Sequence, residues 1–411
     1  MITQTTRRPL FSAGQAACVL LGAGVPAMAF SRGMMQTVLA FALVLAFADS
    51  WRMARDNLRT LSRDTVARAI AVLMLCLLPS VALSLHPLTS LGIYLRVALF
   101  MAGGYVFWTH LTADPARLQL TLKSLMVAAC VSFVVVDLGL TVLPEILAWV
   151  RGKSALSMGA VRELKPYASS LMCQIPIILA VGFYLGGRMK AIALGLTVNG
   201  IIVLFALRSD SAVVGLLLAV GAVTVLLWWK SPRLILVMGG LLIVPAAAIG
   251  YRMIFRDFTY VSDGYQPWFS LQVIDFHRQA IWDFVFHKFL ESPWVGYGLN
   301  MISQVPGAGD HVPGINAEFV PSHPHNWLLE VASESGLIGT LPWLAVLAII
   351  VLRYGRRFIN GRRVGALAVV ALTVAFWSSA LFNFSIWAPW WGLTFVALFA
   401  IAAAMESRPN P

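Results

Sequence analysis

The sequence has few charged residues, and this scarcity limits the kinds of protein that it can encode. Asp, Glu, Lys and Arg make up 12% of the 411 residues, whereas hydrophobic residues make up 59% and the mean hydropathy is +0.80. Soluble globular domains carry about 25% charged residues. The composition therefore excludes an ordinary soluble domain.

Cysteine is also scarce, and the spacing of the four cysteines excludes two common uses of this residue. No CxxC pair and no Cys/His spacing typical of zinc sites occurs, and each cysteine lies within an apolar run. We therefore expect buried thiols, and neither zinc ligands nor a disulfide framework, at Cys18, Cys76, Cys130 and Cys173. The sequence also lacks a Walker loop, a Gly-rich phosphate loop and a DxD pair, so nothing supports an ATP-driven or nucleotide-sugar reaction.

Long hydrophobic runs recur along the chain, which is typical of an all-α polytopic membrane protein. We expect one transmembrane domain over residues 1–411, with the first run retained as a span rather than cleaved as a signal peptide. The twelve predicted spans are 11–30, 33–48, 66–85, 90–109, 120–143, 168–187, 190–207, 211–229, 234–250, 336–352, 364–383 and 388–405.

The basic residues predict the orientation of these spans. Lys and Arg gather in alternate short loops, and the positive-inside rule places those loops, with both termini, in the cytoplasm. Most of the net charge of +12 is thereby a topology signal, so we expect no nucleic-acid partner. The residues that carry this signal are Arg52, Arg55, Arg59, Arg63, Arg117, Lys123, Arg188, Lys190, Lys230, Arg233, Arg353, Arg356, Arg357, Arg362 and Arg363.

Two longer loops fall on the opposite, outer side. One covers residues 144–167, and the other covers 251–335 and holds five of the seven histidines. Long loops of this kind are usually functional. Within the second loop, 268–290 has the periodicity of an amphipathic helix lying along the membrane surface, and a Gly/Pro-rich stretch to Pro321 is expected to form a flap.

The segment from Ser322 to Gly339, SHPHNWLLEVASESGLIG, is the strongest candidate for chemistry. With Pro324 in the first helical turn, Ser322 or His323 is the expected N-cap and Gly336 the expected helix end. His325 then lies at a helix N-terminus, which attracts anions and disfavours a protonated imidazole. The alternative is a cap and a loop histidine that only packs a turn.

Basic residues on the outer side are candidate anion ligands. Arg208 ends the seventh span and could hold a lipid-linked phosphate, although arginine at a span end is often only an interfacial anchor. Arg278, in DFHRQAIWDF, is either a second anion ligand or a surface partner of Asp275. Arg162 and Lys165 are either interfacial charges or a platform for a diphosphate.

A metal site is the other interpretation of the histidines. His323, His325, His311 and Glu330 carry suitable ligand atoms, but no third ligand has a convincing spacing. We therefore predict no metal.

These motifs resemble those of the bacterial O-antigen ligases, within the O-antigen polymerase and ligase superfamily. The resemblance covers about residues 194–352 and includes LRSDSA with Arg208, HRQAIWDF with Arg278, ESPWVGYGLN with Tyr297, and HPHNWLLEVASESGLIG with His325. It implies a GT-C-like glycosyltransferase with about twelve transmembrane helices and a long periplasmic loop over 251–335.

The resemblance also implies the reaction and its residues. Such a ligase transfers a glycan from undecaprenyl diphosphate to lipid A–core at the periplasmic face of the Gram-negative inner membrane, with inversion and without ATP, metal or another cofactor. The essential roles map onto Arg208, Arg278 and His325, and substrate contacts are expected at Arg162, Lys165, Asn326, His323 and Tyr297.

Three alternatives remain open at this stage. An O-antigen polymerase or a protein O-oligosaccharyltransferase uses the same donor with another acceptor. A lipid or glycan transporter also has about twelve spans, but transporters usually carry ionisable residues near the membrane midplane.

Overall fold

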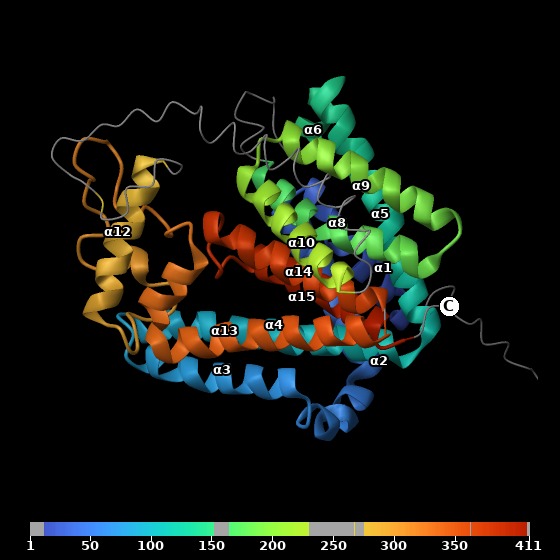
Figure 1. Ribbon diagram of the computed structural model, residues 1–411, viewed down its shortest axis with the longest axis horizontal. Helices are drawn as coiled ribbons and strands as arrows, with labels where there is room; N and C mark the ends of the chain where they lie inside the picture. The colour runs from blue at the N-terminus through green and yellow to red at the C-terminus, as the bar shows by residue number, and fades with distance from the viewer. Residues whose placement is uncertain (1–11, 152–163, 230–266, 268–274, 362, 409–411) are drawn as a thin grey trace, which may run out of the picture.

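The computed structural model describes residues 12–151, 164–229, 267, 275–361 and 363–408, and this part of the chain is helical (Figure 1). A lone β-bridge, between His311 and Glu318, is the nearest approach to a strand within these ranges. The helices are α1 (Ala13–Gly24), η1 (Pro26–Ala29), α2 (Arg32–Leu61), α3 (Thr65–Ala82), α4 (Pro87–Ala113), α5 (Pro115–Thr141), α6 (Pro144–Val150), α8 (Lys165–Leu185), α9 (Arg188–Ala206), α10 (Asp210–Trp228), α12 (Phe276–Glu291), η2 (Ile302–Gln304), α13 (Trp327–Gly361), α14 (Val364–Ser379), η3 (Ala380–Phe382) and α15 (Pro389–Glu406).

Ten helices in the described part of the chain are long and apolar enough to cross a membrane, which confirms an all-α polytopic membrane protein. They are α2, α3, α4, α5, α8, α9, α10, α13, α14 and α15. The predicted span at 11–30 corresponds to the 12-residue helix α1 followed by η1. The predicted span at 234–250 lies outside the described residues.

Helix α2 is longer than the sequence predicted. It runs for 30 residues to Leu61 and so includes Arg52, Arg55 and Arg59, which were expected in a loop. Between Met34 and Leu61 the chain contains neither proline nor glycine, so nothing interrupts the backbone hydrogen bonds where the apolar sequence ends. Polarity marks the end of the span here, but not the end of the helix.

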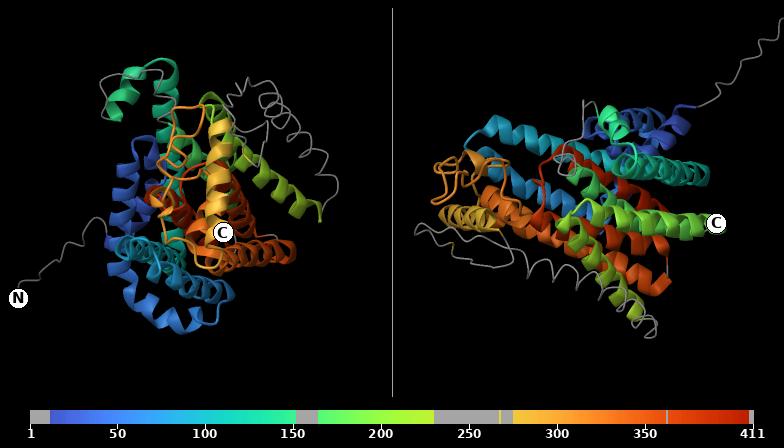
Figure 2. Two further views of the ribbon diagram at one scale, coloured as in Figure 1. Left: turned by 90° about the vertical axis from the view of Figure 1, so that its left-hand side faces the viewer. Right: turned by 90° about the horizontal axis from the view of Figure 1, so that it is seen from above.

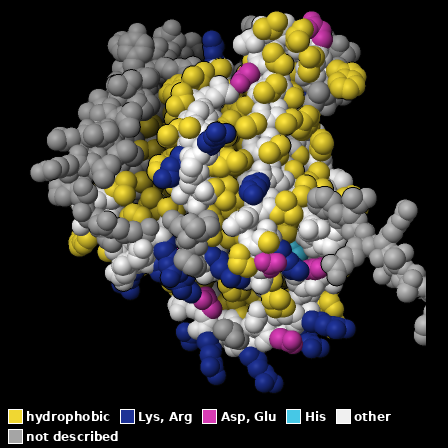
Figure 3. Space-filling model, turned by 90° about the vertical axis from the view of Figure 1, so that its right-hand side faces the viewer, with side chains coloured by type: hydrophobic (Ala, Val, Ile, Leu, Met, Phe, Trp, Pro, Cys, Tyr) yellow, Lys and Arg dark blue, Asp and Glu magenta, His cyan; other side chains and the backbone are white. Residues whose placement is uncertain are grey.

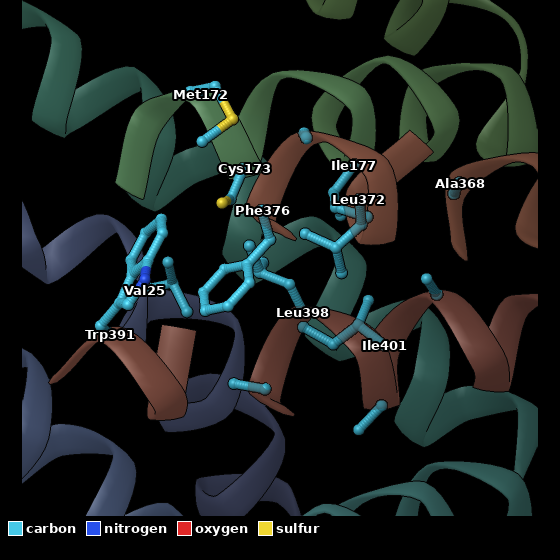
Figure 4. Close-up of a cluster of buried hydrophobic side chains, with 14 of the residues drawn as sticks. Val25, Met172, Cys173, Ile177, Ala368, Leu372, Phe376, Trp391, Leu398 and Ile401 are labelled. Carbon is cyan, nitrogen blue, oxygen red and sulfur yellow. The ribbon is translucent and has the colours of Figure 1, made fainter. Parts of the chain in front are cut away.

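The long helices form a bundle whose centre is densely packed. Helices α3, α4 and α13 run side by side, and α14 and α15 lie between them and the group formed by α8, α9 and α10 (Figures 1 and 2). At the centre, the rings of Phe376 and Trp391 stack with centroids 4.0 Å apart, beside Met172 and Cys173 of α8 (Figure 4). This core fixes the end of α14, which leads directly into η3.

The two ends of the bundle differ chemically. Helix α12 lies across one end of the bundle, beside the ends of α3 and α13 (Figure 1). Lys and Arg side chains gather on the opposite face, towards one edge (Figure 3). Two ion pairs fasten helices together there: Arg353 with Asp64, at 2.5 Å, and Arg357 with Glu406, at 2.7 Å. The basic face lies at the end that the positive-inside rule assigns to the cytoplasm.

Helix α13 is broken at Gly336, as the sequence predicted. Gly336 has φ +59°, and a Cβ atom there would come within 2.1 Å of the backbone of Trp294. The break frees backbone groups that bond the segment 293–298: Tyr297 N donates to Ser333 O at 3.1 Å, and Leu337 N donates to Pro293 O at 2.8 Å. The outer loop is thus joined directly to the membrane helix.

The Gly/Pro-rich stretch does not lie free as a flap. Its apolar side chains pack against α12 in a small core that contains Ile281, Trp282 and Val285 from the helix and Ile302, Val305, Ala308 and Val320 from the stretch. Burial of these side chains stabilises the stretch as a compact loop that supports α12.

Candidate functional site

His325 precedes helix α13 and is not part of it. The helix begins at Trp327, and Asn326 caps it by accepting hydrogen bonds at Oδ1 from Leu328 N at 3.1 Å and Leu329 N at 3.2 Å. The prediction of Ser322 or His323 as N-cap, with Pro324 in the first turn, is therefore wrong. His325 has φ +54°, a left-handed conformation that cannot continue a helix, so the cap moves to the next residue.

The side chain of His325 is oriented by a segment that follows η3. Its Nδ1 lies 3.2 Å from the backbone oxygen of Asn383. A carbonyl oxygen can only accept, so Nδ1 carries the hydrogen in the neutral ring and Nε2 keeps its lone pair. The ring of His323 lies beside it, with centroids 4.1 Å apart. This arrangement presents one imidazole as a base and a second imidazole next to it.

Arg278 is held by the residue before Asn383, at the end of η3. It lies in the first turn of α12, where Nε pairs with Asp275 at 3.3 Å and Nη1 donates to Phe382 O at 3.4 Å. Trp282, one turn further on, donates from Nε1 to Pro324 O at 2.9 Å and so ties α12 to the histidine segment. Arg278 and His325 therefore bind adjacent backbone carbonyls.

The two histidines are neutral near pH 7. Burial, and then the charge of Arg278, lower the pKa of His325 to about 4. Burial, and then the neighbouring His325, lower the pKa of His323 to about 3. The direction agrees with the expectation from the sequence, although burial and Arg278 are its main causes, rather than the helix dipole. A neutral imidazole beside a guanidinium can accept a proton while the cation binds an anion.

The turn formed by residues 382–386 is the part of the site that the sequence analysis missed. Asn383 Nδ2 donates to Ser169 Oγ of α8 at 2.7 Å, which fixes the residue that bonds His325. The buried carboxyl of Glu330 accepts from Ser385 Oγ at 2.6 Å and from Ile386 N at 2.9 Å. The turn is thus hydrogen-bonded to α8 through Asn383 and to α13 through Ser385 and Ile386.

A second buried carboxyl, one helical turn beyond Glu330, organises the neighbouring segments. Glu334 accepts from Trp387 Nε1 at 2.5 Å, from Asn300 N at 2.7 Å and from Ile302 N at 3.0 Å. The pair of glutamates is the signal that could have revealed this scaffold. Buried glutamates are rare unless they are paired or hydrogen-bonded. Here Glu330 bonds the 382–386 turn, and Glu334 bonds the segment 300–302.

The other predicted cations are placed differently. Lys165 begins α8 one turn before Ser169, and its charge contributes to the lowered pKa of His325. Arg208 lies with φ +49° in the turn before α10, exposed to solvent. Gly215 of α10 packs against Ala375 and Ser379, so the start of α10 lies at the η3 end of the bundle. Arg162 lies outside the described residues.

The remaining candidates have structural contacts. Tyr297 donates from Oη to Glu291 at 2.8 Å, and partial burial beside that carboxylate raises its pKa to about 12. His311 lies in the bridge with Glu318, and both carboxyl oxygens of Glu330 are bonded to the 382–386 turn. Across the ranges that the structure describes, no three His, Cys, Asp or Glu side chains gather as metal ligands.

Comparison with known proteins agrees with the position of this site in the chain. Residues 192–344 match the family model described as O-antigen ligase. This range includes Arg208, Arg278, His323 and His325.

Three rickettsial proteins with the name "Putative polysaccharide ligase" are similar to part of the chain. The protein of Rickettsia conorii is 29% identical over 119 residues, that of Rickettsia typhi 26% over 122 residues, and that of Rickettsia felis 27% over 119 residues. Each alignment covers 28% or 29% of both chains. Over the region that holds Arg278 and His325, this multi-pass chain is therefore similar to the O-antigen ligase family and to these relatives, and the matches span less than a third of the relatives' length.

Proposed function

We propose that the protein is a glycosyltransferase that moves a glycan from undecaprenyl diphosphate to a sugar hydroxyl of lipid A–core. The reaction takes place at the periplasmic face of the Gram-negative inner membrane. The observation that carries the proposal is the binding of Arg278 and His325 to the adjacent carbonyls of Phe382 and Asn383, within the family region. An anion ligand and a neutral base held this close are the two groups that such a transfer needs.

The arginines act on the leaving group. As the bond between the anomeric carbon and the donor oxygen breaks, the electron pair stays on the diphosphate, whose negative charge increases. Arg278, with Arg208 at the same end of the bundle, binds that charge and stabilises the transition state. Guanidinium groups suit phosphate oxygens because they donate two parallel hydrogen bonds. Lys165 adds positive charge at the same place, and Arg162 is a further proposed ligand of the diphosphate.

His325 acts on the acceptor. Its Nε2 takes the proton from the sugar hydroxyl while the hydroxyl oxygen forms the new bond to the anomeric carbon. The hydrogen bond from Nδ1 to Asn383 O holds the ring in the tautomer that this step requires. Direct attack opposite the leaving diphosphate inverts the anomeric configuration. We expect His323, next to His325, and Asn326, at the helix cap, to contact the acceptor or donor sugar, with Tyr297 as a further candidate.

The test is transfer in vitro by the purified full-length protein. Undecaprenyl-linked glycan and lipid A–core are supplied in detergent or liposomes without ATP, and the capped product is separated on a gel. Capped lipid A–core supports the proposal. Protein that moves the lipid-linked glycan across a bilayer but forms no new glycosidic bond would refute it and favour transport.

A gene deletion separates the proposal from its nearest rival. Loss of a ligase leaves bare lipid A–core while lipid-linked polymer accumulates. Loss of a polymerase leaves core capped by a single repeat unit, and that result would refute the choice of acceptor while keeping the donor chemistry.

A further inference from the structure

An apolar cavity of about 480 Å³ lies within the helix bundle and reaches the candidate site at Ile386, in the 382–386 turn. It is enclosed by α3, α4, α13, α14 and α15, and its wall is mainly aliphatic and aromatic. None of His323, His325, Arg278 and Lys165 lines it. The cavity therefore requires an explanation of its own, and an apolar cavity inside a membrane bundle suits a hydrocarbon chain.

The cavity has a polar end and an apolar end. Trp343 and Trp387 line the end towards the 382–386 turn, with ring centroids 5.8 Å apart. The charged lining residues are Asp64, Arg353 and Arg357, and all of them lie at the opposite end of the bundle. Trp343 and Arg357 are 14 residues apart along α13, which corresponds to about 21 Å. One leaflet of a bilayer core is about 15 Å thick, so the cavity is long enough for a complete acyl chain.

The polar end adjoins a second hollow. This hollow, of about 600 Å³, shares Arg357 and Ser407 with the apolar cavity and is also lined by Asn360, Arg363 and Glu406. A ligand with an apolar chain in the first cavity and a polar head in the second would pass beside Arg357.

Positive charge exceeds negative charge where the two spaces meet. Arg353 pairs with Asp64 at 2.5 Å. Arg357 and Arg363 share one carboxylate, that of Glu406, at 2.7 Å and 3.7 Å. Three guanidinium groups thus face two carboxylates, and Arg357 is exposed. The excess favours an anionic head group, and basic residues near a membrane surface each contribute attraction to anionic lipids.

From these observations we propose that the two adjoining spaces bind one anionic phospholipid, drawn from the leaflet at the basic end of the bundle. One acyl chain occupies the cavity up to Trp343, and the phosphate lies beside Arg357 and Arg363. The occupant is a membrane phospholipid rather than the lipid-linked donor, because its cationic contacts lie at the opposite end of the bundle from Arg278 and His325. A lipid held there would brace α13, which carries the glutamates behind the site.

Native mass spectrometry of the detergent-purified full-length protein tests this proposal. Protein stripped of lipid is titrated with dioleoyl phosphatidylglycerol or with dioleoyl phosphatidylcholine, which share acyl chains and differ in net charge. The wild type is expected to retain one phosphatidylglycerol roughly fivefold more tightly than phosphatidylcholine, the difference that one arginine near the phosphate provides. Arg357→Gln should abolish this preference.

Matched variants distinguish the site from general attraction to lipid. Arg356→Gln removes an adjacent, exposed arginine that lines neither space and should keep the preference. Ala67→Phe fills the cavity and should weaken the binding of both lipids. Val72→Phe, at an exposed position of the same helix that does not line the cavity, should leave their binding unchanged. Thermal unfolding verifies that each variant is folded.

Three results would overturn the proposal. The first is equal retention of the two lipids by the wild type. The second is a loss of the preference in Arg356→Gln that is as complete as in Arg357→Gln. The third result is displacement of the bound phosphatidylglycerol by undecaprenyl phosphate, with a raised KM for the donor in Ala67→Phe, which would assign the cavity to the donor. The binding measurements do not depend on glycan transfer, so they stand apart from the proposed function.

Discussion

Nδ1 of His325 lies 3.2 Å from the backbone oxygen of Asn383, and the neighbouring carbonyl, of Phe382, accepts from Arg278 at 3.4 Å. His325 is 58 residues from Asn383, and Arg278 is 104 residues from Phe382. The relative position of base and cation therefore depends on the turn formed by residues 382–386.

Replacement of His325 by alanine should reduce glycan transfer by roughly 10²- to 10⁴-fold, because the acceptor hydroxyl loses its general base. The measurement is the initial rate of capping of lipid A–core by purified protein. His287→Ala is the matched control, because this exposed histidine lies on α12 in the same loop and its Nδ1 contacts only its own helix, at Asp283 O, at 2.8 Å. Equal activity losses in the two variants would remove His325 from its proposed role.

Transfer should remain active well below the pH at which an ordinary histidine becomes protonated. Burial and Arg278 lower the pKa of His325 to about 4, so its Nε2 remains a base at all pH values above that. The acid limb of the pH–rate profile should therefore have an apparent pKa near 4, rather than about 6.5. In Arg278→Gln the limb should move to higher pH, since one cause of the lowered pKa is removed. A limb near 6.5 in the wild type would contradict the buried geometry.

The same shift predicts how acid affects folding. In the unfolded chain a histidine has a pKa of about 6.5, whereas His325 in the folded protein has a pKa of about 4. Between these values the unfolded state binds more protons, so the free energy of unfolding decreases as the pH falls through that window. Thermal unfolding in detergent should show a lower midpoint at pH 4.5 than at pH 7, and His325→Gln should reduce the difference.

The sequence predicted the helical membrane fold, the broken helix at Gly336 and a neutral histidine beside an arginine. These features depend on local signals: hydrophobic length, a glycine after an amphipathic run, and residue types in known motifs. The N-cap was misplaced by several residues because the left-handed backbone of His325 is set by tertiary contacts that the sequence does not display. The predicted span ended before helix α2 does, because the prediction followed hydrophobicity. The helix continues through its polar end, which has no helix-breaking residue.

The role of the 382–386 turn could not be predicted, since the atoms that bond Arg278 and His325 are backbone carbonyl oxygens, which every residue has. The sequence indicated only the residues that bond the turn. Glu330 and Glu334 are acidic residues one turn apart on a helix that enters the membrane, and their burial demands hydrogen-bond donors from somewhere. Which segment provides those donors is a property of the folded chain.

Arg278→Lys should lower transfer by about 10²- to 10³-fold, the loss typical when a donor to transition-state charge is removed. The guanidinium bonds Asp275 through Nε and Phe382 O through Nη1, and still has further N–H groups for a phosphate. A lysine ammonium cannot satisfy these two partners and a diphosphate in the same geometry. Single-turnover transfer with saturating donor measures the effect. Near-normal rates for the lysine variant would show that a point charge suffices.

Chelating agents should leave transfer unchanged. The proposed chemistry places the leaving diphosphate on Arg208 and Arg278, and both oxygens of Glu330 are occupied by Ser385 and Ile386. The rate is compared before and after dialysis against EDTA, with a Mg²⁺-dependent glycosyltransferase as the positive control. Strong inhibition that is reversed by one added divalent ion would reinstate the metal interpretation of the histidines.

Glu330→Gln should impair catalysis through the turn rather than through contact with substrate. Both oxygens of Glu330 accept hydrogen bonds, and an amide offers only one acceptor. Its NH2 group either opposes the Ile386 N–H or donates to Ser385 Oγ, and in the second case the Ser385 hydroxyl proton loses the acceptor that it has in the wild type. A buried donor without a partner costs about 1–3 kcal/mol, and the turn relieves this cost by shifting. The bond between His325 and Asn383, which raises the pKa of His325, then weakens, so the acid limb should move to still lower pH as the rate falls.

Glu334→Gln is the matched control, since Glu334 holds Asn300, Ile302 and Trp387 and makes no hydrogen bond to Asn383 or Ser385. It should lower the unfolding temperature without moving the acid limb. If Glu330→Gln also lowers only the unfolding temperature, and the rate per folded molecule and the pH profile remain those of the wild type, then Glu330 is a structural residue and the orientation of His325 does not depend on it.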